Sequence, residues 1–211
     1  MARHRLPTRR TGLLRLRAVL AGGLVFGVGA AVTLAAWTDR EYGTGTFTAS
    51  TFDTESTSAA TSTGWASNAT APGAALAFNA TGMSPGSLQY ATLNVRTTLA
   101  TNVAGTVVLT SAATTGTLPA VLTYRVIRTP LTTTTCNAAA FTAGSAYIAG
   151  SNAPAYQGAS TVPAVPVSSS LPAANGEIRY CFEVLMAPIA STSYQGTTGT
   201  ITWLFTATSV S

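Results

Sequence analysis

The acidic residues are the side chains best suited to chemistry in this chain, and they occur in small groups. The six carboxylates pair locally as Asp39 with Glu41, Asp53 with Glu55, and Glu177 with Glu183. In an extended chain, residues two apart point to the same side, so the first two pairs could bind a cation or act as acid and base. Solvated surface charge is the simpler interpretation, and we favour it.

Imidazole and amine chemistry are almost absent. The one histidine is His4, inside an arginine-rich N-terminal segment, and the chain contains no lysine. Histidine-dependent triads, histidine zinc sites and lysine Schiff bases are therefore excluded from the rest of the chain. We expect no enzyme activity, no cofactor and no bound metal.

Two cysteines, Cys136 and Cys181, complete the set of reactive side chains. In an exported, thiol-poor chain such a pair predicts a disulfide rather than a catalytic or metal-binding site. A bridge that closes about 45 residues would stabilise the fold by roughly 2 to 4 kcal/mol. Two separate buried thiols are the alternative.

The three tryptophans, Trp37, Trp65 and Trp203, raise the question of sugar binding. Trp203 lies at an inward position of an alternating segment, which predicts a core residue. Trp65 lies among glycine, serine and threonine residues, where exposure, an interface or a sugar contact all stay open. No ligand follows from either residue.

The sequence pattern predicts that the elements which must position these residues are strands. Five segments alternate between apolar and polar residues: 91–99, 103–111, 122–128, 178–186 and 201–205. In 178–186 the alternation points Arg179, Cys181 and Glu183 away from the core, with Glu183 next to Arg179 or an arginine of a neighbouring strand. No helical pattern follows residue 37. The pattern predicts an all-β antiparallel sandwich of roughly seven to nine strands.

The polar segments between these strands carry weaker signals. Residues 54–73 read as a flexible arm or a long loop, and 187–199 as a loop. Residues 151–176 are predicted to form a long irregular segment that prolines interrupt, with a candidate edge strand at 161–167.

The net charge of +5 belongs to the N-terminus. Six of the 11 arginines lie within the first 17 residues, whereas after residue 35 five arginines face six carboxylates, a balance of −1. Because nucleic-acid binding needs a concentrated basic face, this distribution excludes a nucleic-acid partner.

An uncharged run at 18–37 follows the basic head. It predicts a signal peptide or a transmembrane helix, with the basic end inside and the remainder exported. The pair Arg9-Arg10 also permits a twin-arginine signal, which we do not favour. We expect a signal peptide at 1–35, an N-terminal arm with the first strand at 36–60, and a β-sandwich domain at 61–211. Membrane contact is expected only through an uncleaved N-terminal segment.

The junction after this run resembles a known family. The order of its sequence elements is similar to that in the exported substrates of SipW-type signal peptidases, the TasA and camelysin family of bacterial matrix proteins. These elements are an apolar run, then TLAAWTD, then GTFTASTFD. Residues 83–111 and 194–209 resemble further parts of that family. The resemblance implies that signal peptidase cleaves between Ala35 and Ala36.

The resemblance also implies a fold and a function. They are a jelly-roll-like β-sandwich and assembly of the secreted protein into extracellular fibres of a biofilm matrix, in which a freed N-terminal segment adds a strand to the next subunit. Trp37, Tyr42 and Phe47 are the candidate self-assembly residues. The protease activity claimed for camelysin is not expected, because the exported part lacks histidine.

Two other functions stay open. A cell-surface binding module for glycan or protein would use Trp65 and the loops of 151–176. A hydrolase would depend on carboxylates or on a metal that they hold. We favour the secreted, non-enzymatic structural protein.

Overall fold

The computed structural model describes residues 11–31, 40–46, 48–80, 82–133, 135–152 and 155–210. The chain forms two compact units, 1–47 and 48–211. The first unit contains the helix α1 (Thr11–Ala31). Within the described ranges, no helix combines the length and the apolar character needed to cross a membrane. The expected cleavage residues Ala35 and Ala36 lie outside the described residues.

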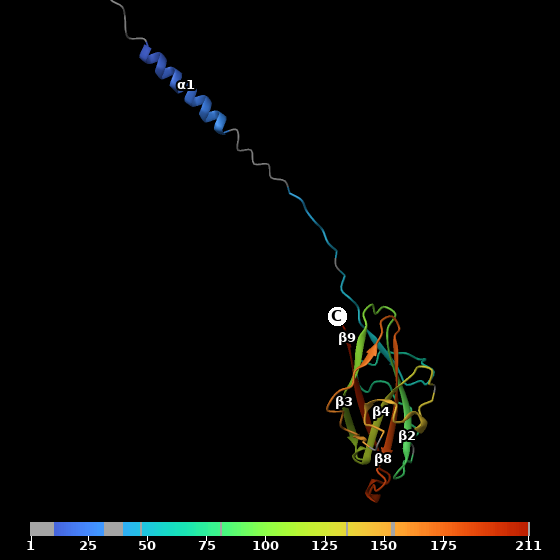
Figure 1. Cartoon of the computed structure of the whole chain (residues 1–211). Coiled ribbons are helices and arrows are strands. Elements are labelled where there is room, and N and C mark those ends of the chain that lie inside the picture. The colour runs from blue at the N-terminus through green and yellow to red at the C-terminus, as the bar shows by residue number, and fades with distance from the viewer. Residues whose placement is uncertain are drawn as a thin grey trace, which may run out of the picture. The chain divides into compact units, whose positions relative to one another are not determined.

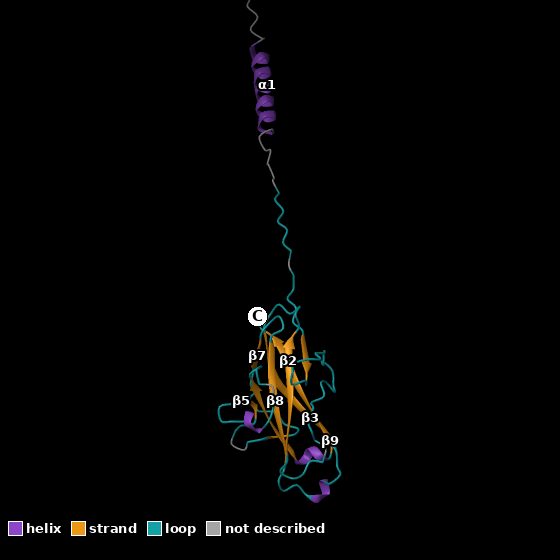
Figure 2. Cartoon of the chain, turned by 90° about the vertical axis from the view of Figure 1, so that its right-hand side faces the viewer, coloured by secondary structure: helices purple, strands orange, loops and turns teal. Residues whose placement is uncertain are grey.

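The second unit is a sandwich of two antiparallel sheets, which confirms the predicted all-β class (Figures 1 and 2). Sheet A has the order β1-β2-β8-β4-β5, and β6 also pairs with β4. Its strands are β1 (Thr54–Thr57), β2 (Leu88–Thr97), β4 (Leu122–Thr129), β5 (Ala146–Ala149), β6 (Gln157–Gly158) and β8 (Glu177–Met186). Sheet B has the order β7-β3-β9, formed by β7 (Ser169–Leu171), β3 (Gly105–Gly116) and β9 (Gly199–Ser209). Three single-turn helices lie in the connections: Leu118–Val121, Ala138–Ala140 and Thr192–Tyr194.

The core lies between the sheets and follows the predicted alternation. Ile178, Tyr180 and Phe182 of β8 are buried toward sheet B, and Trp203 and Phe205 of β9 pack against them. The rings of Phe182 and Trp203 lie 4.9 Å apart. Aromatic and β-branched side chains at every second position explain why these two segments form long core strands, of 10 and 11 residues.

Three local predictions were wrong. No strand forms at 161–167, where Pro163 and Pro166 remove backbone donors, and the short strands β6 and β7 lie on either side of it. Leu99 is 75% exposed, because β2 ends at Thr97 and the chain turns there. The segment 54–73 is not wholly an arm or a loop, since it begins with β1, which pairs with β2.

Sheet A is covered on both faces. Arg179, Cys181 and Glu183 point away from the core as predicted, yet all three are buried. Residues of the long connection between β4 and β6 lie over them, held by the disulfide between Cys136 and Cys181, whose Cα atoms are 5.4 Å apart. The predicted bridge is therefore confirmed, and the outward face of β8 is an interior surface.

Candidate assembly surface

One side of the sandwich exposes a long strand edge. Within the described part of the chain, the 11-residue strand β9 pairs with β3 alone, so its other edge has no strand partner. The outward side chain of Leu204, at the centre of β9, is 55% exposed. Unpaired backbone groups along such an edge can pair with a further strand.

The facing edge of sheet A is only half covered. Strand β1 pairs with Asn94–Thr97 of β2, whereas Leu88–Leu93 pairs with β8 alone among the described strands. The open part of β2 contributes Gln89 and Leu93 to a cavity that residues of β9 also line. The segment 74–80, here called the seam segment, lines the same cavity with five of its residues: Ala74, Ala75, Leu76, Phe78 and Ala80.

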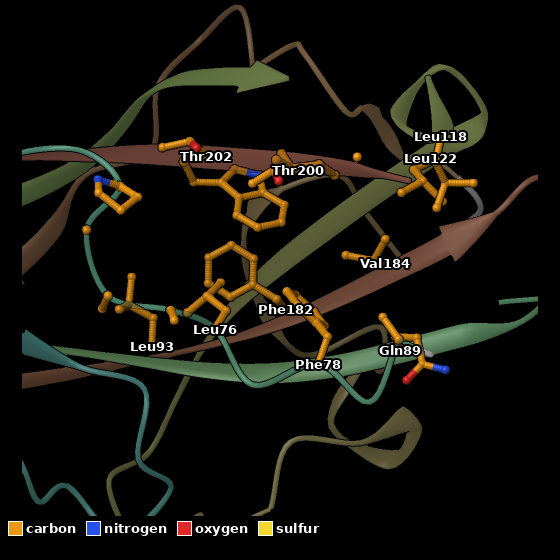
Figure 3. Close-up of a pocket in the computed structure, with 18 of the residues that line it drawn as sticks. Leu76, Phe78, Gln89, Leu93, Leu118, Leu122, Phe182, Val184, Thr200 and Thr202 are labelled. Carbon is orange, nitrogen blue, oxygen red and sulfur yellow. The ribbon is translucent and has the colours of Figure 1, made fainter. Parts of the chain in front are cut away.

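The cavity is partly open and has a volume of about 1550 Å³. Figure 3 shows Thr200 and Thr202 of β9 on one side of it, and Phe182 and Val184 of β8 on the other. Leu76 and Phe78 of the seam segment also line it. A concave, largely apolar space beside a free strand edge is suited to receive apolar side chains from an added strand.

The aromatic residues Phe78, Phe182 and Trp203 form part of the wall of this cavity, and Tyr124 packs against Trp203 without lining it. The ring of Trp203 lies 5.4 Å from Tyr124, 4.9 Å from Phe182 and 6.1 Å from Phe78. Burial raises the pKa of Tyr124 to about 12, and its hydroxyl donates to the carbonyl of Thr161 at 2.7 Å. The wall is thus fixed by packing and by one hydrogen bond to a neighbouring loop.

The N-terminal arm is anchored where it enters the sandwich. The backbone N–H of Thr51 donates to Asn102, and that of Asp53 donates to the Thr101 hydroxyl. Before this anchor, Tyr42 is 86% exposed. The other two candidate assembly residues, Trp37 and Phe47, lie outside the described residues.

The predicted carboxylate pairs do not converge on one site. Asp53 accepts a hydrogen bond from the backbone N–H of Thr54, whereas Glu55 forms an ion pair of 2.8 Å with Arg96. Glu41 is exposed, and Asp39 lies outside the described residues. In the described ranges, no three histidine, cysteine or acidic side chains gather as a metal site.

Glu183 lies at the centre of a buried cluster. It is fully buried and receives both arms of the Arg125 guanidinium, at 2.6 and 3.1 Å, from the adjacent strand β4. This confirms the prediction of an arginine neighbour on the next strand. The Tyr156 hydroxyl donates to the same carboxylate at 2.5 Å.

The charge of this cluster shifts the tyrosines around it. Burial, followed by the hydrogen bond to Glu183 and its charge, raises the pKa of Tyr156 to about 12. The pKa of Tyr90 also rises, from burial first and then from the Glu183 charge. Burial alone would lower the pKa of Arg125, but the hydrogen bond and charge of Glu183 outweigh it and raise that pKa. These directions keep the Tyr90 and Tyr156 hydroxyls protonated and the Arg125 guanidinium charged around the Glu183 carboxylate.

A second buried group ties sheet A to its covering loops. Arg179 donates to Asn94 at 2.7 Å, to the Ser62 hydroxyl at 2.6 Å and to the carbonyl of Leu131 at 2.9 Å. Glu177 accepts from the same Ser62 hydroxyl and lies 3.8 Å from Arg179. Asn94 is fully buried. Alternation alone could not reveal its role, since it places Asn94 on the outward face of β2.

Trp65 is engaged within the molecule. The Arg96 guanidinium lies 4.3 Å from the centre of its ring, and its indole N–H donates to the carbonyl of Ser62 at 2.9 Å. A sugar ring stacked on that face would have to displace Arg96 from both Trp65 and Glu55.

The seam segment is the functional candidate that the sequence analysis missed. Its signal is the alternation Ala74-Ala75-Leu76-Ala77-Phe78, in which every second residue is larger or faces inward. Alanine at the intervening positions conceals the pattern, because alanine is neither polar nor a marker of a strand.

Comparison with known proteins adds no family assignment. No known family model matches this chain, and no curated protein matches it either.

Proposed function

We propose that this chain is a secreted, non-enzymatic structural protein that assembles with itself on or near the cell surface. Strand addition is the mode of assembly: an extended segment of one copy pairs with the sandwich of the next. The free 11-residue edge of β9 is the observation that carries the proposal. Main-chain hydrogen bonds along such an edge provide affinity, and pockets for alternate side chains provide register.

The donor in this proposal is the N-terminal segment 36–50. Its aromatic residues Trp37, Tyr42 and Phe47 supply side chains for an apolar groove. Signal peptidase cleavage between Ala35 and Ala36 would free this segment. The anchoring of Thr51 and Asp53 keeps the donor attached to a fixed point of its own sandwich.

The location and family belong to the same proposal. The disulfide is consistent with an oxidising, extracellular environment. The junction TLAAWTD and the motif TFTASTFD, which leads directly into β1, support membership of the TasA and camelysin family. The nested pairings of β2 with β8 and of β3 with β7 support a jelly-roll-like sandwich, in which a long hairpin rolls up on itself.

Electron microscopy and sedimentation of the purified exported chain, residues 36–211, test the proposal. We expect filaments or large oligomers, and monomers once residues 36–50 are deleted. N-terminal sequencing of the exported product should begin at Ala36. Monodisperse monomers under all conditions, with a free N-terminus, would overturn self-assembly.

A further inference from the structure

The seam segment, residues 74–80, has the side-chain pattern of a strand without the hydrogen bonds of one. Ala74, Leu76 and Phe78 are partly buried and pack against the core, whereas Ala75 and Ala77 are exposed. Among the described residues, its one backbone hydrogen bond is the local contact from the Phe78 N–H to the Leu76 carbonyl. Side-chain burial therefore holds this segment in place, without a β-ladder.

Glycines in left-handed backbone conformations flank the seam segment. Gly73 has φ of 75° and Gly82 has φ of 69°, and neither has a heavy atom near the position of an added Cβ. Glycine adopts such angles without the strain that a side chain would add. The seam segment is thus a short apolar strap between two backbone conformations that favour glycine.

The seam segment shares a local sequence with the N-terminal arm. Residues 47–50 read Phe-Thr-Ala-Ser, and residues 78–81 read Phe-Asn-Ala-Thr. In both, phenylalanine and alanine alternate with hydroxyl or amide side chains. In extended backbone this places the phenylalanine and the alanine on one face and the polar residue between them on the other.

We infer that the seam segment is an internal substitute for the donor strand, and that residues 43–50 of a second copy displace it. Phe47 of the incoming arm takes the position of Phe78 beside Trp203, and its backbone pairs with the free edge of β9. This inference rests on the proposed function. It locates the groove that accepts the donor strand and describes how donor binding is regulated.

Because the seam segment occupies the groove, it lowers the apparent affinity for the donor strand without blocking the groove permanently. A donor strand gains the backbone hydrogen bonds that the seam segment does not make, yet it must first displace Leu76 and Phe78 from the cavity. The apparent dissociation constant is the intrinsic one divided by the fraction of molecules whose groove is empty. Weakening the seam segment must therefore tighten donor binding.

A labelled peptide of residues 40–50 provides the test. The acceptor is the exported chain with Phe47→Ser, which disables its own donor and leaves the sandwich unaltered. The acceptor variants are Phe78→Ser, which removes the apolar anchor, and Phe78→Leu, which keeps it apolar but removes the ring beside Trp203. Ala77→Ser, on the exposed face of the same segment, is the matched control. Fluorescence anisotropy gives the dissociation constants, and near-ultraviolet circular dichroism confirms folding.

We expect the peptide to bind the Phe78→Ser acceptor at least tenfold more tightly than the parent, with Phe78→Leu between them and Ala77→Ser equal to the parent. A peptide with Phe47→Ser should bind none of them. If Phe78→Ser fails to fold, Phe78→Leu decides. Equal binding to all acceptors would show that the seam segment does not compete with the donor, and it would leave the proposal of strand addition unchanged. Binding to none, while the unaltered chain forms polymers, overturns the inference by placing the donor elsewhere. Binding to none with no polymers overturns the proposed function as well.

Discussion

Sheets A and B differ in how completely the chain covers them. The central strand β8 of sheet A is buried along both faces, with Arg179, Cys181 and Glu183 enclosed beneath the connecting loops. In sheet B, outward side chains of β9 lie at the surface, and the exposed ones include Thr200, Leu204, Thr206 and Thr208. One edge of β9 also has no strand partner in the described ranges. Sheet A is thus enclosed on both faces of its central strand, whereas sheet B keeps an unpaired strand edge and exposed side chains within the described ranges.

The difference also separates two uses of polar residues. In sheet A, the buried charged side chains Arg179 and Glu183 are paired and hydrogen-bonded, so each one ties a covering loop to a strand. In sheet B, threonine hydroxyls remain at the surface, where they are solvated and contribute little to folding. Substitutions in the two sheets should therefore have unequal effects on the free energy of unfolding.

The largest expected loss comes from breaking the buried ion pair of sheet A. Arg125→Met leaves the Glu183 carboxylate buried without its guanidinium partner, which should lower the free energy of unfolding by about 3 to 5 kcal/mol. Urea unfolding followed by circular dichroism measures the loss. The control is Arg96→Met, at the partly exposed Glu55–Arg96 pair, where about 1 kcal/mol or less is expected. Equal losses at the two sites would contradict the view that burial makes the difference.

The next largest effect concerns the disulfide over the outer face of sheet A. Replacing both Cys136 and Cys181 by serine should lower the free energy of unfolding by about 2 to 4 kcal/mol, because the bridge constrains a segment of 45 residues. Thermal unfolding with and without reductant measures it. Reductant should destabilise the unaltered chain and leave the double variant unchanged; a reductant effect on both would show that it acts elsewhere.

Alternation along the sequence predicted the strands that build the core but not what covers them. The regular spacing of Ile178, Tyr180 and Phe182 identifies β8 and its inward face. Whether Glu183 on the other face meets water depends on the long β4–β6 connection, whose sequence has no periodicity. The disulfide was predictable from chemistry, since it requires only two cysteines and an oxidising location.

The candidate assembly surface was less predictable for a different reason. A sequence can show that residues 199–209 form a strand, but an open edge is a property of the whole topology. The short strand β7, Ser169–Leu171, has no alternation long enough to detect. The seam segment carries its signal in only Leu76 and Phe78, too few residues for a strand assignment.

A smaller loss should follow Tyr156→Phe, which removes one hydrogen bond to the charged Glu183 carboxylate. At neutral pH we expect about 1.5 to 3 kcal/mol less free energy of unfolding. The folded-state pKa of Tyr156 is raised from 10.0 to about 12. Its contribution is therefore fully present below pH 10 and is lost as the pH rises from 10 to 12.

Unfolding free energies measured at several alkaline pH values test this sign. Tyr156→Phe should make the fall in stability between pH 10 and 12 less steep. The fall should not vanish, because Tyr124 and Tyr180 are buried and also have a pKa of about 12. A steeper fall in the variant would contradict the assigned direction.

The smallest effect on folding is expected at the free edge of sheet B, where the proposed assembly is most sensitive. Leu204→Lys places a charge at an exposed position in the middle of β9, so the free energy of unfolding should change by no more than about 0.5 kcal/mol. The same charge opposes the approach of another strand, as lysines do at natural sheet edges. Sedimentation should show the loss of large oligomers, while Ile189→Lys, in a loop at 95% exposure, should assemble normally. Assembly that survives Leu204→Lys but fails with Ile189→Lys would move the contact from the β9 edge to the loop before it.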